Sequence, residues 1–460
     1  MRGAIAAGHP VTAEVGADIL RRGGNAVDAC VAAGFASWVA ESPLTGPGGG
    51  GFMLVHTPRA TRVLDFFVTV PSGEREDPDE VTIVFDGTNT QLFRVGKGTC
   101  AVPGNAAGLE EAHRAYGRLA WRDVVAPAVG LARDGVDVTE GQALLHLILA
   151  PVMEGTPAAG LGTGKRLVWP DLAATLERIA RRGAAAVYTG EVARAVMRHV
   201  PSIRRDDLAS YRPVWRRPVR VPYRSHVFAS NPPPSSGGVL IGYGLRMLER
   251  PGRAGSRAAV ERLARTMQAQ AHARERRLTR KLVEVGGTTH VSVVDADGNA
   301  ASLSASTGGG GSGVVVPGTG IHMNNMLGEY DLMVGKPRPG RRLTSMMAPS
   351  IALDGTRPRL VLGSAGSNRL RGAIMQIVVD VLAHGMGVRD AIEFARAHYE
   401  DGHLHLEPGL EAPQGDWELV RWKDRNLFFG GVSAVELLGD GTLAAAGDPR
   451  RGGAGVVVNP

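Results

Sequence analysis

The chain has 460 residues, of which 43% are hydrophobic and 21% charged, and this balance excludes an intrinsically disordered protein. Its formal net charge of +7 raises the question of nucleic-acid binding. No apolar run reaches the roughly 18 residues that a membrane helix needs, and the run 32–40 is among the longest.

The N-terminus and the cysteine content indicate the compartment. Arg2 and His9-Pro10 interrupt any signal-peptide core. Cys30 and Cys100 are too few for a disulfide scaffold or for a cysteine-based zinc site. We therefore expect a protein of the cytoplasm, with no membrane segment and no bound metal.

The positive charge is concentrated in one segment. Between Arg253 and Lys281, nine cations oppose two anions, so this segment accounts for the whole net charge. Apolar residues at 260, 263, 264 and 267 share one side of a predicted helix, with arginines on the other side. Because no aromatic side chains are interleaved for base stacking, we interpret the segment as a solvated helix face and predict no nucleic-acid partner.

Periodicity and turn residues predict helices and strands in alternation along the chain. In the first predicted helix, Thr12 to Arg22, Thr12 caps the start and Gly23-Gly24 ends the helix. Further helices are predicted at 105–117, 121–134, 171–182, 188–199, 256–280, 369–384 and 388–397. Strands are predicted at 52–56, 61–66, 289–294, 300–306, 349–354 and 358–362. This mixture favours a single body of layered sheets covered by helices.

The most informative stretch is 286–299, GGTTHVSVVDADGN. Valine alternates with serine over 291–293 as in a half-buried strand, and 297–299 is a hairpin-turn signal. If the turn centres on Asp297, the numbers of paired residues sum to about 594, which places Ser306 beside Thr288. A hydroxyl held next to another hydroxyl can orient and polarise it.

A threonine hydroxyl is a poor nucleophile without a nearby base. No His-Asp pair stands at a suitable spacing, and the alternative base is an N-terminal amine, whose pKa of about 7.7–8.0 suits that role. This alternative requires the chain to break before Thr288, by attack of the Thr288 hydroxyl on the unshielded Gly287 carbonyl. The residues alone also fit an ordinary turn that leads into a strand.

Residues 287–299 resemble the processing site of the γ-glutamyltransferases (γ-glutamyltranspeptidases), which are N-terminal-nucleophile hydrolases. The resemblance covers nearly the whole chain, because further motifs follow in the order that the family has. They are GGNAVDA at 23–29, GGGGFML at 48–54, VPG at 102–104, PPPSSGG at 232–238, GIHMNN at 320–325, GSAG at 363–366 and DPR at 448–450.

The resemblance implies an α/β fold of the αββα-sandwich type. It also implies self-cleavage between Gly287 and Thr288 into residues 1–287 and 288–460, which pair as a heterodimer. Thr288 is then the nucleophile, with Ser306 beside it and with no cofactor. By the same resemblance, Gly366 and Ser367 form the oxyanion hole. The family has glycine at the second of these positions, and a serine still supplies its backbone N–H.

The departures from the family fall where a γ-glutamyl group is held. The family places an arginine after Asp-Phe to bind the substrate carboxylate, and this chain has Phe67 there, which cannot make a bidentate charged contact. Loss of such a contact costs about 2–5 kcal/mol where the carboxylate is left unpaired. The family's paired serines, its Asn-Asn motif and its aspartate imply substrate-binding roles for Thr344 and Ser345, Asn325 and Glu329.

Several of these positions also have a purely structural interpretation. Phe67 fits a core position, with an arginine from elsewhere reaching the pocket, and Met326, which replaces the family's Gln, fits a packing position. His290 should point away from the face that Thr289 occupies, so we give it no catalytic role. Cys30 is interpreted as buried filler, and Asp28 and Asp65 as structural caps.

We therefore expect a self-processing hydrolase that acts on a small molecule other than glutathione. One branch of the family serves antibiotic pathways that build alkylproline units, as in lincomycin and pyrrolobenzodiazepine assembly, and it hydrolyses a C–C bond beside an α-keto acid. The substitution at Phe67 favours that branch. The alternatives are an ordinary γ-glutamyl hydrolase or transpeptidase with a rebuilt pocket, and an unprocessed, non-catalytic binding protein.

Overall fold

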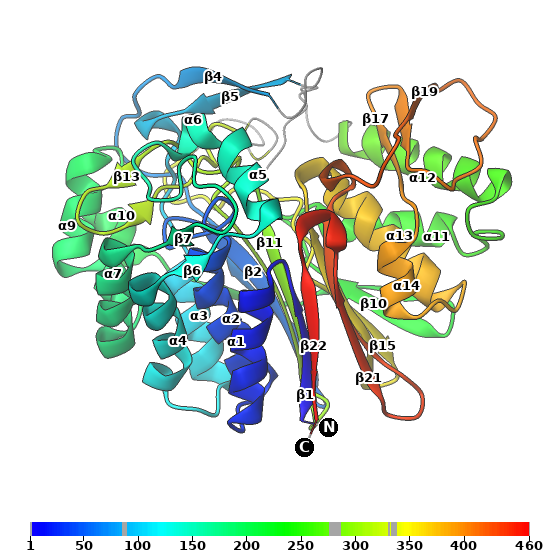
Figure 1. Ribbon diagram of the computed structural model, residues 1–460, viewed down its shortest axis with the longest axis horizontal. Coiled ribbons are helices and arrows are strands. Elements are labelled where there is room, and N and C mark those ends of the chain that lie inside the picture. The colour runs from blue at the N-terminus through cyan, green and yellow to red at the C-terminus, as the bar shows by residue number, and fades with distance from the viewer. Residues whose placement is uncertain (1, 85–89, 276–286, 330–331, 333–337, 460) are drawn as a thin grey trace.

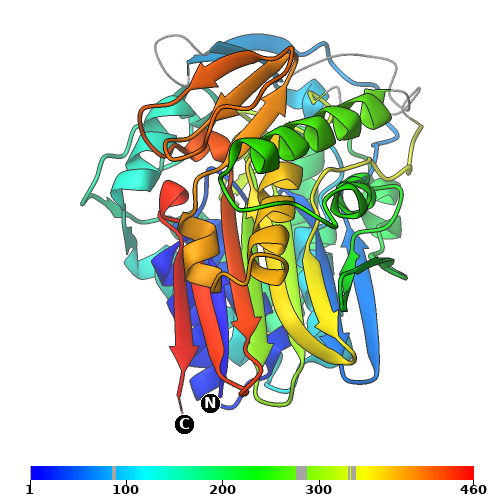
Figure 2. The same ribbon diagram turned by 90° about the vertical axis from the view of Figure 1, so that its right-hand side faces the viewer.

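Two β-sheets lie face to face at the centre of the molecule, and helices cover the outer side of each sheet (Figure 1). The computed structural model describes residues 2–84, 90–275, 287–329, 332 and 338–459. Both chain ends lie at the lower end of the sheets (Figures 1 and 2). The layers follow the order helix, sheet, sheet, helix, so the predicted αββα sandwich is confirmed.

The first sheet has seven strands, and every neighbouring pair in it is antiparallel. Segments from both ends of the chain lie side by side at one edge, because the C-terminal strand pairs with the N-terminal one. In spatial order the strands are β22 (Ala454–Val458), β1 (Gly3–Ala7), β11 (Thr289–Asp295), β12 (Ala300–Ser306), β2 (Gly50–Thr57), β3 (Ala60–Phe66) and β8 (Val214–Arg216).

The second sheet has six strands, also antiparallel throughout. Figure 2 views the molecule from this side. In spatial order the strands are β21 (Leu443–Gly447), β20 (Gly431–Leu437), β16 (Arg357–Ala365), β15 (Ser350–Asp354), β10 (His226–Ser230) and β9 (Val219–Tyr223).

The helices divide between the two outer faces (Figure 1). Those on the first sheet's side are α1 (Pro10–Arg21), α2 (Ala26–Ala40), α3 (Asn105–Tyr116), α4 (Trp121–Asp134) and α7 (Pro170–Arg182), and those on the second sheet's side are α11 (Gly237–Met247), α12 (Arg257–Glu275), α13 (Leu370–Leu382) and α14 (Val388–Glu393). Shorter helices are α5 (Glu140–Ile148), α6 (Ala150–Met153), α8 (Ala185–Tyr188), α9 (Gly190–His199) and α10 (Arg205–Ser210). Small sheets pair β4 (Asp79–Val84) with β5 (Thr90–Val95), β6 (Val136–Asp137) with β7 (Arg166–Leu167), β13 (Val315–Val316) with β14 (Ile321–His322), and β17 (Ala397–Glu400) with β18 (His403–Leu406) and β19 (Glu418–Arg421).

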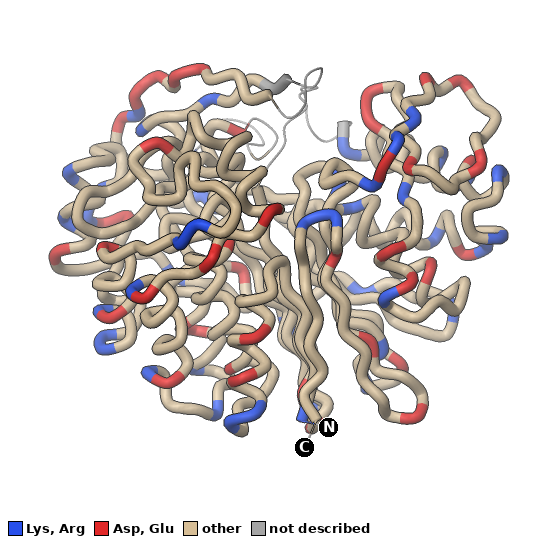
Figure 3. The backbone as a smooth tube through the Cα atoms, in the orientation of Figure 1, with Lys and Arg blue, Asp and Glu red and all other residues tan. Residues whose placement is uncertain are grey.

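Three apolar layers hold these elements together, one between the two sheets and one under each set of helices. The layer between the sheets contains several small side chains, such as Ala4, Ala6 and Ala229, together with larger ones such as Ile351. β11 is buried over its whole length, because one of its faces packs on helices and the other packs on the second sheet. Charged residues lie mainly outside these layers (Figure 3).

The hairpin register matches the sequence prediction. Thr289 pairs with Ala305, and His290 pairs with Ser304, so paired residue numbers sum to 594 and the predicted register is confirmed. One prediction about the first helix was wrong. His9 is the N-cap, because its side chain accepts a hydrogen bond from the Val11 amide, whereas Thr12 lies inside α1.

The predicted amphipathic helix is present as α12 (Arg257–Glu275). Val260, Ala264 and Met267 are buried, while Arg262 and Arg265 are exposed, as the solvated-face interpretation predicts. The predicted continuation to residue 280 lies outside the described residues. Among those that are described, no helix combines the length and the apolar character needed to span a bilayer.

Candidate active site

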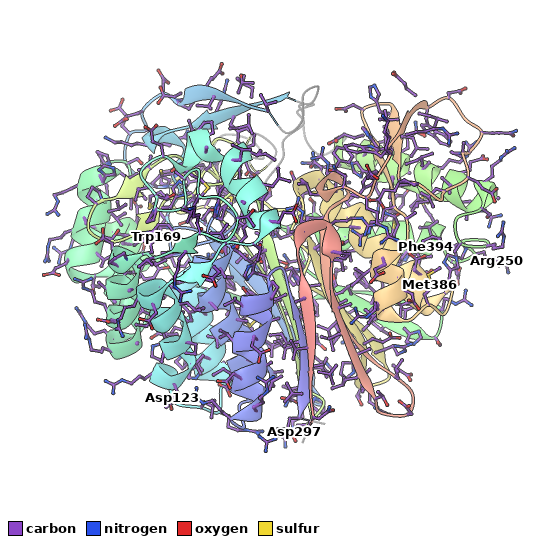
Figure 4. All side chains as sticks on the ribbon, viewed as in Figure 1. Asp123, Trp169, Arg250, Asp297, Met386 and Phe394 are labelled. Atoms are coloured by element: carbon purple, nitrogen blue, oxygen red, sulfur yellow. The ribbon has the colours of Figure 1, made fainter. Side chains whose placement is uncertain are left out.

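A pocket lies at the end of the first sheet opposite the β11–β12 turn. Figure 4 places Asp297, in that turn, at the lower end of the sheets, so Thr288 lies at the other end of β11. The pocket is open to solvent, and about 350 Å³ of space in and at its mouth is free of protein atoms. Its lining residues are Phe67, Thr288, Ser306, Met326, Glu329, Leu332, Ser345, Met346, Met347, Ser367 and Leu370.

Thr288 and Ser306 both line the pocket, from neighbouring strand ends. Ser306 Oγ donates a hydrogen bond to the carbonyl oxygen of Gly287. It also accepts a hydrogen bond from the backbone N–H of Gly308, at 2.8 Å. Because Ser306 Oγ accepts from an amide, its own hydrogen points at the Gly287 carbonyl oxygen, and this hydrogen bond polarises the carbonyl group.

The glycine motif at 48–51 places Ser306 through close backbone packing. A Cβ added at Gly49 would collide with the carbonyl oxygen of Ser306, and β2 pairs with β12 as far as Gly50 and Ser306. Only glycine allows the two backbones to approach this closely. The motif therefore has a structural role next to the hydroxyl that contacts Gly287.

The loop after β16 brings Ser367 to the same pocket. Gly366 has φ of +119° and Ser367 has φ of +53°, so both residues lie in the left-handed region that favours glycine. The short helix Ser367–Arg369 follows and runs into α13. A Cβ added at Gly366 would lie 2.9 Å from the Cα of Gly430, so the loop backbone rests against that turn. Backbone amides at such a helix start suit the binding of developing negative charge.

Phe67 is both core and pocket wall. It is buried, lines the pocket, and stacks on Phe52 with ring centroids 5.3 Å apart. Asp65 accepts hydrogen bonds from the Phe67 amide at 3.0 Å and from Arg216 Nε at 2.8 Å, so its structural interpretation fits these contacts. Arg342 lies 3.6 Å from Asp65 and donates to the Phe67 carbonyl, away from the pocket lining.

The predicted substrate-binding residues fall into two groups. Glu329 and Ser345 line the pocket together with Phe67, whereas Asn325 and Thr344 are not among its lining residues. The Thr344 hydroxyl donates to the Leu332 carbonyl at 2.8 Å. Asn325 is buried, and its backbone N–H donates to the Thr307 carbonyl at 2.7 Å. The substrate-binding roles of Asn325 and Thr344 stay predictions.

Much of the pocket wall is apolar, a feature that sequence reasoning did not identify. Met326, for which the sequence favoured a packing position, lines the pocket and belongs to the same apolar cluster as Phe67, Met346 and Leu370. Among the described lining residues none is a lysine or an arginine, and Glu329 is the one charged side chain. Also within the described part of the chain, no group of three His, Cys, Asp or Glu side chains is placed to hold a metal ion.

A buried carboxyl group next to the site was also missed. Glu41 follows α2 and accepts hydrogen bonds from the hydroxyls of Thr289 and Thr12. Burial raises the pKa of Glu41 to about 7. The available signal was an acidic residue at the end of the apolar run 32–40.

His290 lies between the two sheets, on the face opposite Thr289. Its ring nitrogens bond the hydroxyls of Ser304 at 2.8 Å and Ser292 at 3.0 Å. Burial lowers the pKa of His290 to about 3, so its imidazole is neutral near pH 7. The predicted orientation of His290 is therefore confirmed.

Comparison with known proteins identifies the family. The γ-glutamyltranspeptidase family matches residues 12–286 and 279–458. The chain is 30% identical to a glutathione hydrolase proenzyme of Pseudomonas aeruginosa, with 100% of this chain and 95% of that protein covered. It is 32% identical to the acylase ACY 1 proenzyme of Pseudomonas sp. strain SE83, with 100% and 94% covered.

Solved structures share the fold over the whole chain. A cephalosporin acylase from Bacillus halodurans superimposes with a TM-score of 0.83 at 23% identity and covers 100% of this chain and 96% of its own. LmbA superimposes with a TM-score of 0.81 at 21% identity and covers 99% and 98%. The match to the family over almost all of the sequence shows that this chain is an enzyme of the γ-glutamyltranspeptidase family of N-terminal-nucleophile hydrolases.

Proposed function

We propose that the protein cleaves its own chain between Gly287 and Thr288 and then uses Thr288 as an N-terminal nucleophile. The observation that carries this proposal is the hydrogen bond from Ser306 Oγ to the Gly287 carbonyl. Thr288 Oγ attacks the polarised carbonyl carbon, the C–N bond to Thr288 breaks, and the freed nitrogen takes up a proton. Water then hydrolyses the resulting ester, which leaves a carboxylate at Gly287 and a free hydroxyl on Thr288.

The sheet order supports a lasting pair of fragments after cleavage. Residues 1–287 supply β1 and β2, while residues 288–460 supply β22, β11 and β12. In the first sheet these strands alternate, because β1 lies between β22 and β11, and β12 pairs with β2. Separating the fragments would break three strand pairings in this sheet, so we propose that they stay together as a heterodimer.

In the mature enzyme the free amine of Thr288 serves as the general base for its own hydroxyl. The hydroxyl attacks the substrate carbonyl, and the backbone N–H groups of Gly366 and Ser367 stabilise the oxyanion. The leaving group departs with the proton from the Thr288 amine, and water cleaves the acyl-enzyme ester. No step in this cycle uses a cofactor.

The lining of the pocket supports a substrate without the amino-acid head group of glutathione. Phe67 stands where a γ-glutamyl carboxylate needs a guanidinium, and Met326 and Leu370 add apolar surface. We propose a conjugated α-keto acid whose C–C bond is hydrolysed, as in alkylproline antibiotic pathways of the lincomycin and pyrrolobenzodiazepine type.

In that reaction Thr288 Oγ bonds to the keto carbon, and the adjacent C–C bond breaks. The electron pair moves into the conjugated leaving group, which is then protonated at carbon. The acyl group left on Thr288 is then an oxalate half-ester, and water hydrolyses this ester, which releases oxalate and frees Thr288. The apolar wall suits the uncharged conjugated part, while the Ser345 hydroxyl supplies a neutral donor for the carboxylate.

Ordinary γ-glutamyl hydrolysis or transfer is the second candidate, and one observation favours it. Glu329 lines the pocket and carries the charge that binds an α-amino group, with Ser345 nearby as a hydroxyl donor. The relative from Pseudomonas aeruginosa is a glutathione hydrolase proenzyme, and the relative from strain SE83 is an acylase proenzyme.

A two-part assay tests these proposals. A denaturing gel with N-terminal sequencing should show two fragments, the smaller beginning at Thr288, whereas one intact band in an active preparation contradicts the mechanism and favours the unprocessed binding protein. Processed enzyme is then given a conjugated α-keto acid and γ-glutamyl-p-nitroanilide, with Thr288→Ala as the control. Faster turnover of the γ-glutamyl compound overturns the C–C substrate and leaves the nucleophile proposal standing.

We also propose the cytoplasm as the compartment. Cys30 and Cys100 are both free thiols in buried positions, which fits a reducing environment.

A further inference from the structure

Glu41 connects the first two helices of the chain with the start of the distant strand β11. Its side chain accepts hydrogen bonds from Thr12 in α1, at 2.8 Å, and from Thr289 at the start of β11, 248 residues away. Its backbone N–H donates to Ser37 in α2, at 2.8 Å. Gly8 lies against the same carboxyl group, because a Cβ added there would collide with it. These contacts fix the Glu41 carboxyl group next to Thr289, the residue that follows Thr288.

The turn after Glu41 reaches the predicted cleavage site as well. The Glu41 carbonyl accepts the amides of Leu44 and Thr45, at 2.8 and 3.2 Å, which fixes the turn. Leu44 in turn accepts the Thr307 amide at 3.1 Å, next to Ser306. A Cβ added at Gly287 would lie 3.2 Å from the Leu44 side chain. Glu41 therefore bonds the residue after Thr288, while the turn that follows Glu41 lies against Gly287 on the other side of the predicted cleavage bond.

Cleavage would remove the covalent restraint on Thr288. Thr289 would then be the second residue of a new chain end, held by its pairing with Ala305 and by its hydroxyl bond to Glu41. Backbone pairing fixes only the direction of the strand. If the Thr288 amine acts as the base, it must also keep a defined angle to the Thr288 hydroxyl. The side-chain bond supplies this second restraint.

We propose that Glu41 is a positioning residue that acts through the Thr289 hydroxyl to hold the amino-terminal Thr288 in its reactive geometry. This inference rests on the proposed role of Thr288 as the nucleophile. It adds a residue from the first fragment, outside the pocket lining, that sets the turnover rate without touching substrate.

The charge of Glu41 has a defined consequence for this role. As a carboxylate it accepts hydrogen bonds from both threonine hydroxyls, whereas a protonated carboxyl group forces one of them to reverse. Among the described residues no cation is paired with Glu41, and the facing groups are the neutral hydroxyls of Thr12 in α1 and Thr289 in β11. On the connection between β1 and α1 the titratable neighbour is His9, whose pKa burial lowers to about 4, so it is neutral near pH 7. Turnover should therefore fall as Glu41 takes up a proton.

The test compares the kcat of variants per processed molecule, with the processed fraction measured on a gel. The substrate is whichever of the conjugated α-keto acid and γ-glutamyl-p-nitroanilide the wild type converts faster. We expect Glu41→Gln and Thr289→Val each to lower kcat about tenfold with KM within twofold, a factor that corresponds to a misplaced rather than an absent nucleophile. Thr289→Ser, which keeps the hydroxyl, should retain wild-type kcat within about twofold. The double variant Glu41→Gln with Thr289→Val should be no slower than either single variant, because both remove one contact.

Thr175→Val is the matched control. Thr175 in α7 is also buried, and its hydroxyl donates to the Thr319 carbonyl at 2.7 Å, on an element that does not border the pocket. This variant should lose a similar amount of thermal stability and keep its kcat. A kcat loss in Thr175→Val equal to that in Thr289→Val would show a general stability effect and would overturn the proposal.

The pH profile of kcat separates positioning from packing. In the wild type, protonation of the Thr288 amine stops turnover, and protonation of Glu41 lowers turnover further by about the tenfold expected for Glu41→Gln. The log kcat slope on the acid side should therefore exceed one around pH 7, where Glu41 takes up its proton, and should be one throughout in the variant. If Glu41→Gln keeps the wild-type kcat and the wild-type pH slope while Thr288→Ala is inactive, the role of Glu41 is refuted and the proposed function stands. If Thr288→Ala is active, the proposed function itself is refuted.

Discussion

Ser306 donates its hydroxyl hydrogen to the carbonyl oxygen of Gly287, a residue 19 positions earlier in the chain. The hairpin register brings the two together, since β11 and β12 pair in the order that places position 306 opposite 288. The Gly308 amide fixes the hydroxyl from its other side. The proposed self-cleavage depends on this hydroxyl, which contacts the carbonyl that Thr288 would attack.

Replacement of Ser306 should slow self-cleavage. Ser306→Ala removes the donor to the Gly287 carbonyl, and loss of one such donor typically costs a factor of roughly 10²–10³ in rate. Gel densitometry after expression should show the intact chain accumulating. Ser306→Thr keeps the hydroxyl and should process at a rate close to that of the wild type. Complete processing of Ser306→Ala within the time that the wild type needs would contradict this role.

Replacement of Phe67 by arginine should shift the enzyme toward γ-glutamyl substrates. A guanidinium at this position supplies the positive charge that the pocket lining lacks, and a buried charge pair that loses one partner costs about 2–5 kcal/mol. We expect Phe67→Arg to lower KM for γ-glutamyl-p-nitroanilide at least about tenfold, together with a loss of thermal stability from the broken stack on Phe52.

Phe67→Leu is the matched control for that change, because it breaks the stack without adding charge. Its KM for the γ-glutamyl compound should stay at the wild-type value. If the leucine variant lowers KM as much as the arginine variant does, pocket size rather than charge limits this substrate.

Substitutions at Ser367 should separate the backbone N–H from the side chain. Ser367 has φ of +53°, a conformation that costs a non-glycine residue about 1–2 kcal/mol. Ser367→Gly should therefore keep its activity and gain up to about 1 kcal/mol in unfolding free energy. Ser367→Pro removes the amide and cannot adopt this φ, so its kcat should fall at least about 10²-fold. Kinetics and chemical denaturation measure both effects, and an active proline variant would exclude this amide from the oxyanion hole.

The buried His290 should make stability depend on acid pH. Its pKa is about 3 in the folded protein, against an ordinary 6.5, so the unfolded chain binds a proton that the folded protein refuses. The stability that His290 contributes is therefore complete above pH 6.5 and is lost as the pH falls toward 3, at about 1.4 kcal/mol per pH unit.

Unfolding free energies of the wild type and His290→Gln, measured from pH 8 to pH 4, test this effect. The variant should be less stable at pH 8, because it alters the bonds to Ser292 and Ser304. The gap between the two proteins should narrow below pH 6.5. Parallel profiles over the whole range would show that His290 takes up its proton in the folded state.

Elements whose signals are local could be predicted from the amino-acid sequence. The strand alternation and the turn at Asp297 predicted the β11–β12 register, because pairing across a short hairpin follows from the turn position. The arginine face of α12 was predicted from helical periodicity, since a surface helix separates its polar and apolar sides. The ordered motifs of the family indicated the fold and Thr288 together.

Features that depend on contacts between segments far apart in the sequence could be seen only in the folded protein. α2 is buried on all sides, so it has no amphipathic period that sequence analysis could detect. The sequence predicted Thr12 as a helix cap. Because α1 packs against the end of α2, the Thr12 hydroxyl instead donates a hydrogen bond to Glu41. Contact between Glu41 and Thr289 spans 248 positions, and the double role of Phe67 depends on Phe52 in another strand. Spacing along a chain predicts neighbours on one helix or hairpin, whereas packing between layers selects which distant side chains meet.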